Sequence, residues 1–160
     1  MSVPLAAGAH RFSHDRQRRF AGAWGLNGVQ IFNTPAIAEG RTMFPKMVVD
    51  AIDSPRLLVS GINNRKIGKV VTVGRWKGFP IYTLTLEERA TCPKTCHHFT
   101  TCYGNTMPRA RRHRHSRDFE ARLDAELRQK SINHPRGFVV RLHILGDFYS
   151  TDYVQLWRGW

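Results

Sequence analysis

The sequence predicts an α/β protein in which a β-hairpin-bearing N-terminal arm is followed by a strand–helix–strand–helix (βαβα) core. A hydrophobic fraction of 41% and four Trp in 160 residues suffice for one domain with a packed interior. An amphipathic helical pattern at 116–133 separates two apolar runs, at 79–86 and 138–145, and another helical pattern follows from residue 150. We place the arm at residues 1–62 and the core at residues 63–160.

The arm is expected to be irregular because glycines and prolines interrupt its apolar stretches. Three glycines fall within residues 22–28 and three prolines within residues 35–55. Residues 44–52 predict a short helix and residues 57–60 a short strand. We expect the arm to wrap the core and not to fold as an independent domain.

The hairpin is predicted from two β-rich runs, 69–73 and 79–86, which a glycine-containing turn at 74–78 separates. In the second run Tyr82, Leu84 and Leu86 alternate with Thr83 and Thr85. Side chains alternate between the two faces of a strand, so this pattern indicates one apolar face.

The helix at 116–133 has a complete set of local signals. Ser116 is a suitable N-cap, and Phe119, Leu123 and Leu127 recur every four residues to form an apolar stripe. Pro135 ends the pattern, because the residue before proline avoids helical geometry. Two acid-first pairs four residues apart also favour the helix: Asp124–Arg128 and Glu126–Lys130.

The run at 138–145 predicts a buried parallel strand that ends at Gly146 and Asp147, with Ser150 or Thr151 capping the next helix. In a regular strand Arg141, His143 and Asp147 would share one face, because their positions are all odd-numbered. A polar stripe on a buried strand indicates either a binding site or side chains satisfied by internal partners.

Three cysteines in the pattern C-x3-C-x5-C are the strongest functional signal: Cys92, Cys96 and Cys102. One disulfide would leave an odd thiol, so a metal is favoured. Three thiolates suit an iron–sulfur cluster with one free iron, whereas zinc would need a fourth ligand such as His97 or His98. Simple burial of the thiols is the third possibility.

Glu88 and Arg89 lie next to the first cysteine in the sequence. They are either groups that orient a bound ligand or ordinary surface charges.

The net charge of +13 predicts an anionic partner, nucleic acid or a nucleotide. Residues 109–117 contain five arginines and no acidic residue, and a solvated linker is the alternative interpretation. Proteins that bind single strands interleave aromatic residues with basic ones, and this run lacks that pattern. The arginines proposed as the anion or nucleic-acid site are Arg109, Arg111, Arg112, Arg114 and Arg117.

No apolar run is long enough for a membrane span and no convincing signal peptide is present, so we expect a cytoplasmic protein without a membrane partner. The oligomeric state is not predicted.

A three-cysteine loop after a strand resembles the radical S-adenosylmethionine enzymes. That resemblance implies a [4Fe–4S] cluster on the three cysteines and S-adenosylmethionine held near Gly146 and Asp147, with His143 as a further candidate. It also implies that the βαβα core is the first part of a truncated, partial βα barrel. The usual spacing in those enzymes is C-x3-C-x2-C, and the second interval here is three residues longer.

A closer resemblance, over about residues 63–157, is to the phage gene product 88 family, whose reaction is not settled. The residues that carry it are Asn64, Lys66, Ile67, Gly68, 82–93, Cys96, 102–107, His143 and 146–150. The resemblance implies a shared fold and site, and a longer chain than this one.

The leading hypothesis is therefore an iron–sulfur protein of the radical-enzyme type with an unknown substrate. The alternative is a zinc-stabilised nucleic-acid-binding module that uses the same thiols and the arginine run. Whether this chain is an active enzyme or an inactive fragment is left open.

Overall fold

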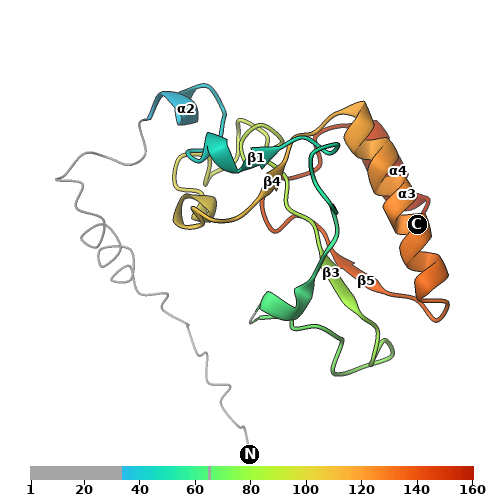
Figure 1. Ribbon diagram of the computed structural model, residues 1–160. Coiled ribbons are helices and arrows are strands. Elements are labelled where there is room, and N and C mark those ends of the chain that lie inside the picture. The colour runs from blue at the N-terminus through green and yellow to red at the C-terminus, as the bar shows by residue number, and fades with distance from the viewer. Residues whose placement is uncertain (1–33, 65) are drawn as a thin grey trace, which may run out of the picture. The chain divides into compact units, whose positions relative to one another are not determined.

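The computed structural model describes residues 34–64 and 66–160 (Figure 1). The elements, in chain order, are α2 (Pro35–Ala38), η1 (Pro45–Met47), β1 (Val48–Val49), β2 (Val59–Ser60), η2 (Gly61–Asn63), β3 (Ile81–Thr83), η3 (Tyr103–Thr106), β4 (Arg112–His113), α3 (Arg117–Asn133), β5 (Val139–Arg141) and α4 (Thr151–Arg158). The coarse α/β prediction is confirmed.

The central sheet has the strand order β2-β3-β5. β3 runs antiparallel to β2 and parallel to β5, with Ile81 opposite Val139. Between these two parallel strands the chain passes through the cysteine loop (residues 91–107), β4 and α3. This is the predicted strand–helix–strand connection. The described strands thus form this sheet and a second, two-stranded parallel sheet of β1 and β4.

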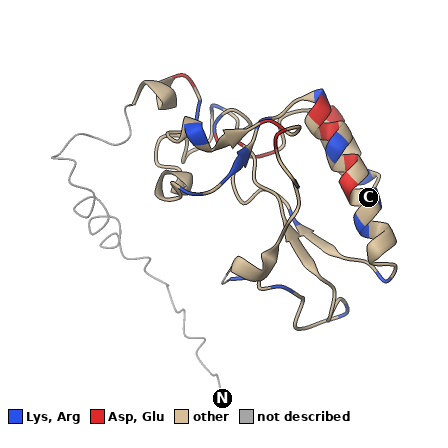
Figure 2. Cartoon of the chain, viewed as in Figure 1, with Lys and Arg blue, Asp and Glu red and all other residues tan. Residues whose placement is uncertain are grey.

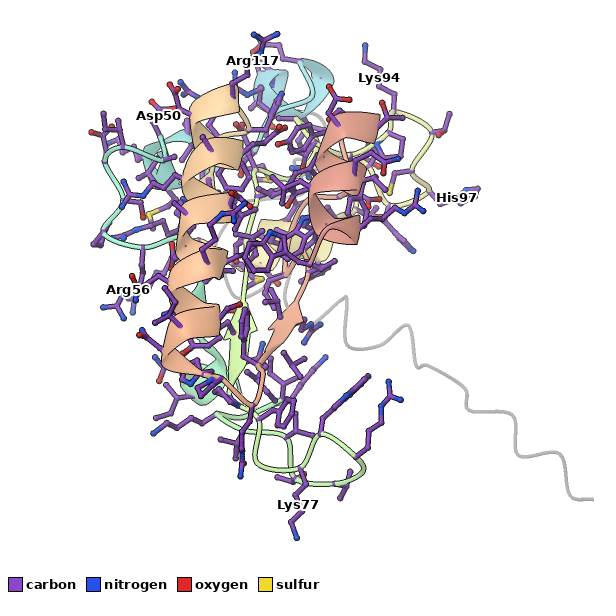
Figure 3. All side chains as sticks on the ribbon, turned by 90° about the vertical axis from the view of Figure 1, so that its right-hand side faces the viewer. Asp50, Arg56, Lys77, Lys94, His97 and Arg117 are labelled. Atoms are coloured by element: carbon purple, nitrogen blue, oxygen red, sulfur yellow. The ribbon has the colours of Figure 1, made fainter. Side chains whose placement is uncertain are left out.

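The long helix follows its sequence signals closely. Ser116 Oγ accepts a hydrogen bond from the Phe119 amide at 3.0 Å, so Ser116 is the N-cap as predicted. Phe119, Leu123 and Leu127 are buried in the core together with Tyr153 of α4. α3 and α4 lie side by side against the sheet (Figures 1 and 3). No helix among the described residues is both long and apolar enough to cross a membrane.

The helix expected at 44–52 is wrong. Pro45 begins one 3-10 turn, which ends at Met47, and the chain then becomes strand β1. Val48 and Val49 pair in parallel with β4, since β-branched side chains favour an extended backbone.

The predicted Glu126–Lys130 pair is also replaced by other contacts. Glu126 accepts from the amides of Leu57 and Leu58 at 2.7 and 3.1 Å. The Lys130 ammonium lies 4.3 Å from the ring centroid of Tyr82.

Residues 34–62, the described part of the arm, contribute to the same interior as the residues that follow. Leu57 and Leu58 are fully buried and pack in one cluster with Leu84 and Leu86. Residues 1–33 of the predicted arm lie outside the described residues.

Candidate metal centre

The cysteine loop follows β3 and a short segment, residues 84–90. Beyond β3 the chain stays bonded to the segment after β5: Leu86 N donates to Leu145 O at 3.0 Å and Ile144 N to Leu84 O at 2.8 Å. The loop therefore leaves from the carboxyl end of a parallel strand, which is where α/β folds commonly place their binding sites.

All three cysteines are free thiols and each is partly buried. Burial raises the pKa of the Cys92 thiol, and the negative charge of Asp147 adds to the rise. Burial also raises the pKa of Cys102, while the positive charge of Arg89 opposes it. The Cys102 Sγ accepts a hydrogen bond from the Gly104 amide at 3.4 Å and so caps η3. Without a metal, both thiols are expected to stay protonated near neutral pH.

The thiols are not already gathered around one point. Within residues 34–64 and 66–160, no group of three or more His, Cys, Asp or Glu side chains is placed to hold a metal ion. Metal binding at these cysteines would therefore require their side chains to turn toward one another.

A buried ion pair lies beneath the loop. Arg112 is fully buried and forms a two-pronged contact with Glu88, from Nε to Oε2 at 2.6 Å and from Nη2 to Oε1 at 3.1 Å. The same guanidinium donates to the carbonyls of Gly104 and Met107, at 3.1 and 3.2 Å. Arg112 thus ties the backbone that follows Cys102 to a buried carboxylate.

Arg89 holds the middle of the loop in the same way. Its side chain is buried, its Nε donates to the Phe99 carbonyl at 2.7 Å, and its Nη2 donates to the Asn105 side chain. Asn105 in turn donates to the Thr100 carbonyl at 3.0 Å. The Arg89 Nη1 lies 3.8 Å from Glu88 Oε1, so two buried arginines share one buried carboxylate.

Two residues of the N-terminal segment extend this network. Arg41 donates to both carboxylate oxygens of Glu87, at 2.7 and 3.1 Å. The Thr42 hydroxyl donates to Glu88 Oε1 at 2.7 Å. Both Glu88 and Arg89 are buried, so the interpretation that they are ordinary surface charges is wrong.

The regular strand that would give Arg141, His143 and Asp147 one shared face does not continue beyond Arg141. β5 ends at Arg141, and His143 has a φ of 51°, which breaks the regular alternation of side chains. His143 Nε2 lies 3.1 Å from the Tyr153 hydroxyl, and its ring meets Phe148 edge-on. Burial lowers the pKa of His143, which favours a neutral ring. Its observed contacts are therefore with α4 and the segment that precedes it.

Gly146 and Asp147 lie directly against the start of the cysteine loop. The Asp147 amide donates to Thr91 Oγ1 at 3.2 Å. Gly146 has a φ of 83°, and a Cβ at this position would lie 2.5 Å from Thr91 Oγ1 and 2.6 Å from the Leu86 Cβ. Only glycine permits this close approach, which brings Gly146 and Asp147 next to the residue before Cys92.

The arginine run is not a solvated linker along its whole length, because β4 lies within it. Arg112 is buried under the cysteine loop, so its inclusion among the nucleic-acid contacts is wrong. Arg114 is half-exposed and lies 3.4 Å from Asp50. Arg109, Arg111 and Arg117 are exposed.

A pocket of about 530 Å³ opens beside Cys92. Lys94 and Phe99 line it from the cysteine loop. Arg41 lines it from the N-terminal segment, and Arg114 from the link between β4 and α3. The pocket places several cationic side chains next to one of the three thiols, a feature that sequence spacing did not reveal.

Comparison of the chain with protein-family models, curated proteins and solved structures gives no match.

Proposed function

We propose that Cys92, Cys96 and Cys102 bind an iron–sulfur cluster, and that the chain belongs to a radical-type enzyme related to the phage gene product 88 family. Bound there, the cluster would supply an iron with an open coordination position for one-electron chemistry. The fold would then be part of a βα barrel. The observation that carries the proposal is the location of all three free thiols on one loop that buried arginines hold in place.

The chemistry of the donor set fits such a cluster. Thiolates are the usual protein ligands of iron–sulfur clusters, and three of them leave one coordination position for another molecule. Arg89 and Arg112 carry two positive charges against the single negative charge of Glu88. Burial and the negative charge of Glu88 raise the pKa of Cys102, although the positive charge of Arg89 lowers it, so cluster binding would have to supply the free energy that deprotonates the thiol.

The neighbouring residues suit a small polar cofactor such as S-adenosylmethionine. Gly146 permits close backbone approach at the start of the loop, and the Asp147 carboxylate can accept hydrogen bonds from an ammonium group. Lys94 lines the pocket beside Cys92 and could bind a carboxylate, whereas Arg41 in the same lining is already paired with Glu87. These groups would bind and orient the cofactor.

The test is anaerobic reconstitution with iron and sulfide. We expect a brown protein that absorbs near 400 nm, as cubane clusters generally do. Replacement of Cys92, Cys96 or Cys102 by Ser should each abolish the absorption, whereas His97→Ala and His98→Ala should leave it intact. Retention of the cluster in any one of the three Ser variants would contradict the assignment.

Zinc bound by the same thiols is the second candidate, because His97 and His98 are exposed on the loop between Cys96 and Cys102. One histidine could complete a tetrahedral site. A colourless protein with one zinc per chain, lost in His97→Ala or His98→Ala, would favour this alternative. If zinc is bound, the alternative function is a nucleic-acid-binding module that uses the exposed arginines of residues 109–117.

A further inference from the structure

The tip of the hairpin before β3 is an ordered projection. Val71 N donates to Phe79 O at 2.9 Å and Gly78 N to Val71 O at 2.8 Å, and Ile81 N donates to Lys69 O at 2.8 Å. Residues 72–78 between these contacts are all exposed. The predicted hairpin is thus present, although the paired strand β3 is shorter than the run 79–86 suggested.

The base of this projection is fixed to the core. Gly137, just before β5, has a φ of 109°, and a Cβ there would lie 2.8 Å from the Phe79 ring. The close packing of Phe79 on this glycine holds the hairpin at the start of the parallel strand pair. The exposed tip is therefore presented on a rigid support.

The tip is strongly basic. Residues 65–80 contain five Lys or Arg and no Asp or Glu. Lys66, Lys69, Arg75 and Lys77 have no acidic partner within the described part of the chain. Arg136 adds a further cation, since its guanidinium lies close to Gly78. Figure 2 shows basic and no acidic positions on this hairpin.

An exposed aromatic side chain lies among these charges. Trp76 is 49% exposed, and the Arg75 guanidinium lies 4.5 Å from its ring centroid. Val73, at the same tip, is 77% exposed. Trp76 and Val73 thus place two exposed apolar side chains together on one charged projection, the arrangement in which a rimmed apolar surface marks an interaction site.

Basic side chains around an exposed indole match the chemistry of a single-stranded polynucleotide. Lys and Arg contact the phosphates, and unpaired bases stack on an aromatic ring regardless of sequence. A duplex keeps its bases stacked and offers the indole no free base face. A membrane-inserting tip would need contiguous apolar residues, whereas Arg75 and Lys77 flank Trp76 directly.

We propose that the hairpin tip formed by Val73, Arg75, Trp76 and Lys77, with Lys69 and Arg136 beside it, binds single-stranded nucleic acid. Trp76 stacks on a base and the surrounding cations contact the phosphates. Phosphates and base faces are common to DNA and RNA, so both kinds of single strand are expected to bind. This inference does not depend on what the cysteine loop binds.

The surface is separate from both sites considered above. The hairpin precedes β3 and the cysteine loop follows it, so the two lie at opposite ends of that strand. Figure 3 shows Lys77 at one end of the view, far from Lys94 and His97 of the cysteine loop. Substitutions at the tip can therefore be made without disturbing the thiols or the arginine run.

The experiment is fluorescence anisotropy of the full chain with labelled oligothymidylate and oligouridylate of about 15 nucleotides, the range that single-strand binding sites cover. Trp76→Ala should weaken binding about 5- to 150-fold, the equivalent of one lost stacked base. Trp76→Phe should retain most of the affinity. The double variant Arg75→Gln/Lys77→Gln should lower the slope of log affinity against log salt by about 1.4.

The matched control is Lys46→Gln/Arg56→Gln, which removes two exposed cations away from the hairpin tip and from the arginine run and should leave affinity and salt slope nearly unchanged. Unaltered binding by the tip variants, or a loss confined to the control, would overturn the proposal. Preference for a duplex of the same length, or for vesicles containing phosphatidylserine, would also overturn it. Far-ultraviolet circular dichroism checks that each exposed substitution leaves the fold intact.

Discussion

Glu88 is the only buried carboxylate shared by two buried arginines among the described residues. Its two oxygens receive hydrogen bonds from Arg112 and Thr42, and Arg89 lies nearby. Because the two arginines bind carbonyls along the cysteine loop, the position of that loop depends on one negative charge. Removing one partner from such a group leaves buried charge uncompensated, which is strongly unfavourable.

We therefore predict that Glu88→Gln lowers the free energy of unfolding by about 3–5 kcal/mol. Glu87→Gln is the matched control: Glu87 is buried as well, but its partner Arg41 is half-exposed, so water can solvate the guanidinium that loses its charged partner. Urea unfolding followed by circular dichroism measures both variants. An equal loss in the two would contradict the role assigned to Glu88.

His113 makes stability depend on pH. Burial, with Arg111 and Arg122 nearby, lowers its pKa from 6.5 to about 4. Its Nδ1 has no hydrogen-bond partner in the described structure, and its ring stacks on Phe119. The unfolded chain takes up a proton below pH 6.5 but the folded chain does so only near pH 4. Stability is thus full above pH 6.5 and falls as the pH drops toward 4.

The expected loss from His113 between pH 6.5 and pH 4 is about 3 kcal/mol. His113→Phe should remove this part of the acid sensitivity, because the ring remains and the titrating group is gone. Urea unfolding at pH 7.5 and pH 4.5 tests it, with exposed His98→Gln as the control. Identical acid sensitivity in His113→Phe and the unaltered protein would refute the assignment. His143, whose pKa is also lowered, contributes equally to both proteins and cancels.

At the residue scale, the sequence predicted one spatial neighbour of the cysteine loop and missed the ion pair beneath it. Gly146 and Asp147 were expected near the cysteines, and they contact Thr91, which precedes Cys92. The sequence assigns Arg112 to the anion or nucleic-acid site because nothing in the residue pattern separates it from the other four arginines of the run. Only the pairing of β4 with β1 and the approach of Glu88 distinguish Arg112, and both are long-range contacts.

At the scale of elements, α3 is joined to the N-terminal segment by one side chain. Glu126 accepts two backbone hydrogen bonds, from the buried residues Leu57 and Leu58 just before β2. These amides have no other acceptor in the described structure. Glu126 therefore stabilises the packing of the helix on the strand in addition to the helix itself.

We predict that Glu126→Ala lowers the free energy of unfolding by about 2–4 kcal/mol, since it leaves two buried amides unpaired. Glu126→Gln keeps one acceptor oxygen and should lose less. Asp124→Ala, which breaks only exposed contacts, the pair with Arg128 and the hydrogen bond from the Trp160 indole, should have a clearly smaller effect. Thermal unfolding of the three variants distinguishes these outcomes, and a loss in Asp124→Ala as large as in Glu126→Ala would contradict them.

Elements with strong local signals were predicted well, and those set by tertiary contacts were not. α3 has a cap, an apolar stripe and a proline stop, so its bounds follow from sequence. Residues 44–52 lack such signals, and pairing with β4 decides their conformation. One shared face for Arg141 and His143 requires a regular strand, and the residue pattern does not show the positive φ of His143 that interrupts it.

At the scale of the whole molecule, residues 34–62 and the βαβα core act together. Thr42 contacts Glu88, β1 pairs with β4 and β2 pairs with β3. The N-terminal segment thus helps to hold both the central sheet and the network beneath the cysteine loop. The two ends of β3 then have different proposed partners, a metal centre at the carboxyl end and nucleic acid at the hairpin end.

The binding of iron and sulfide by the three thiols can be measured by Mössbauer spectroscopy of ⁵⁷Fe-labelled protein purified without oxygen, combined with iron, sulfide and zinc analysis of the same sample. We expect the signature of a cubane cluster, with iron and acid-labile sulfide in equal amounts, and loss of both in Cys96→Ser. Stoichiometric zinc without sulfide, or a metal-free protein that takes up no iron on reconstitution, would contradict it.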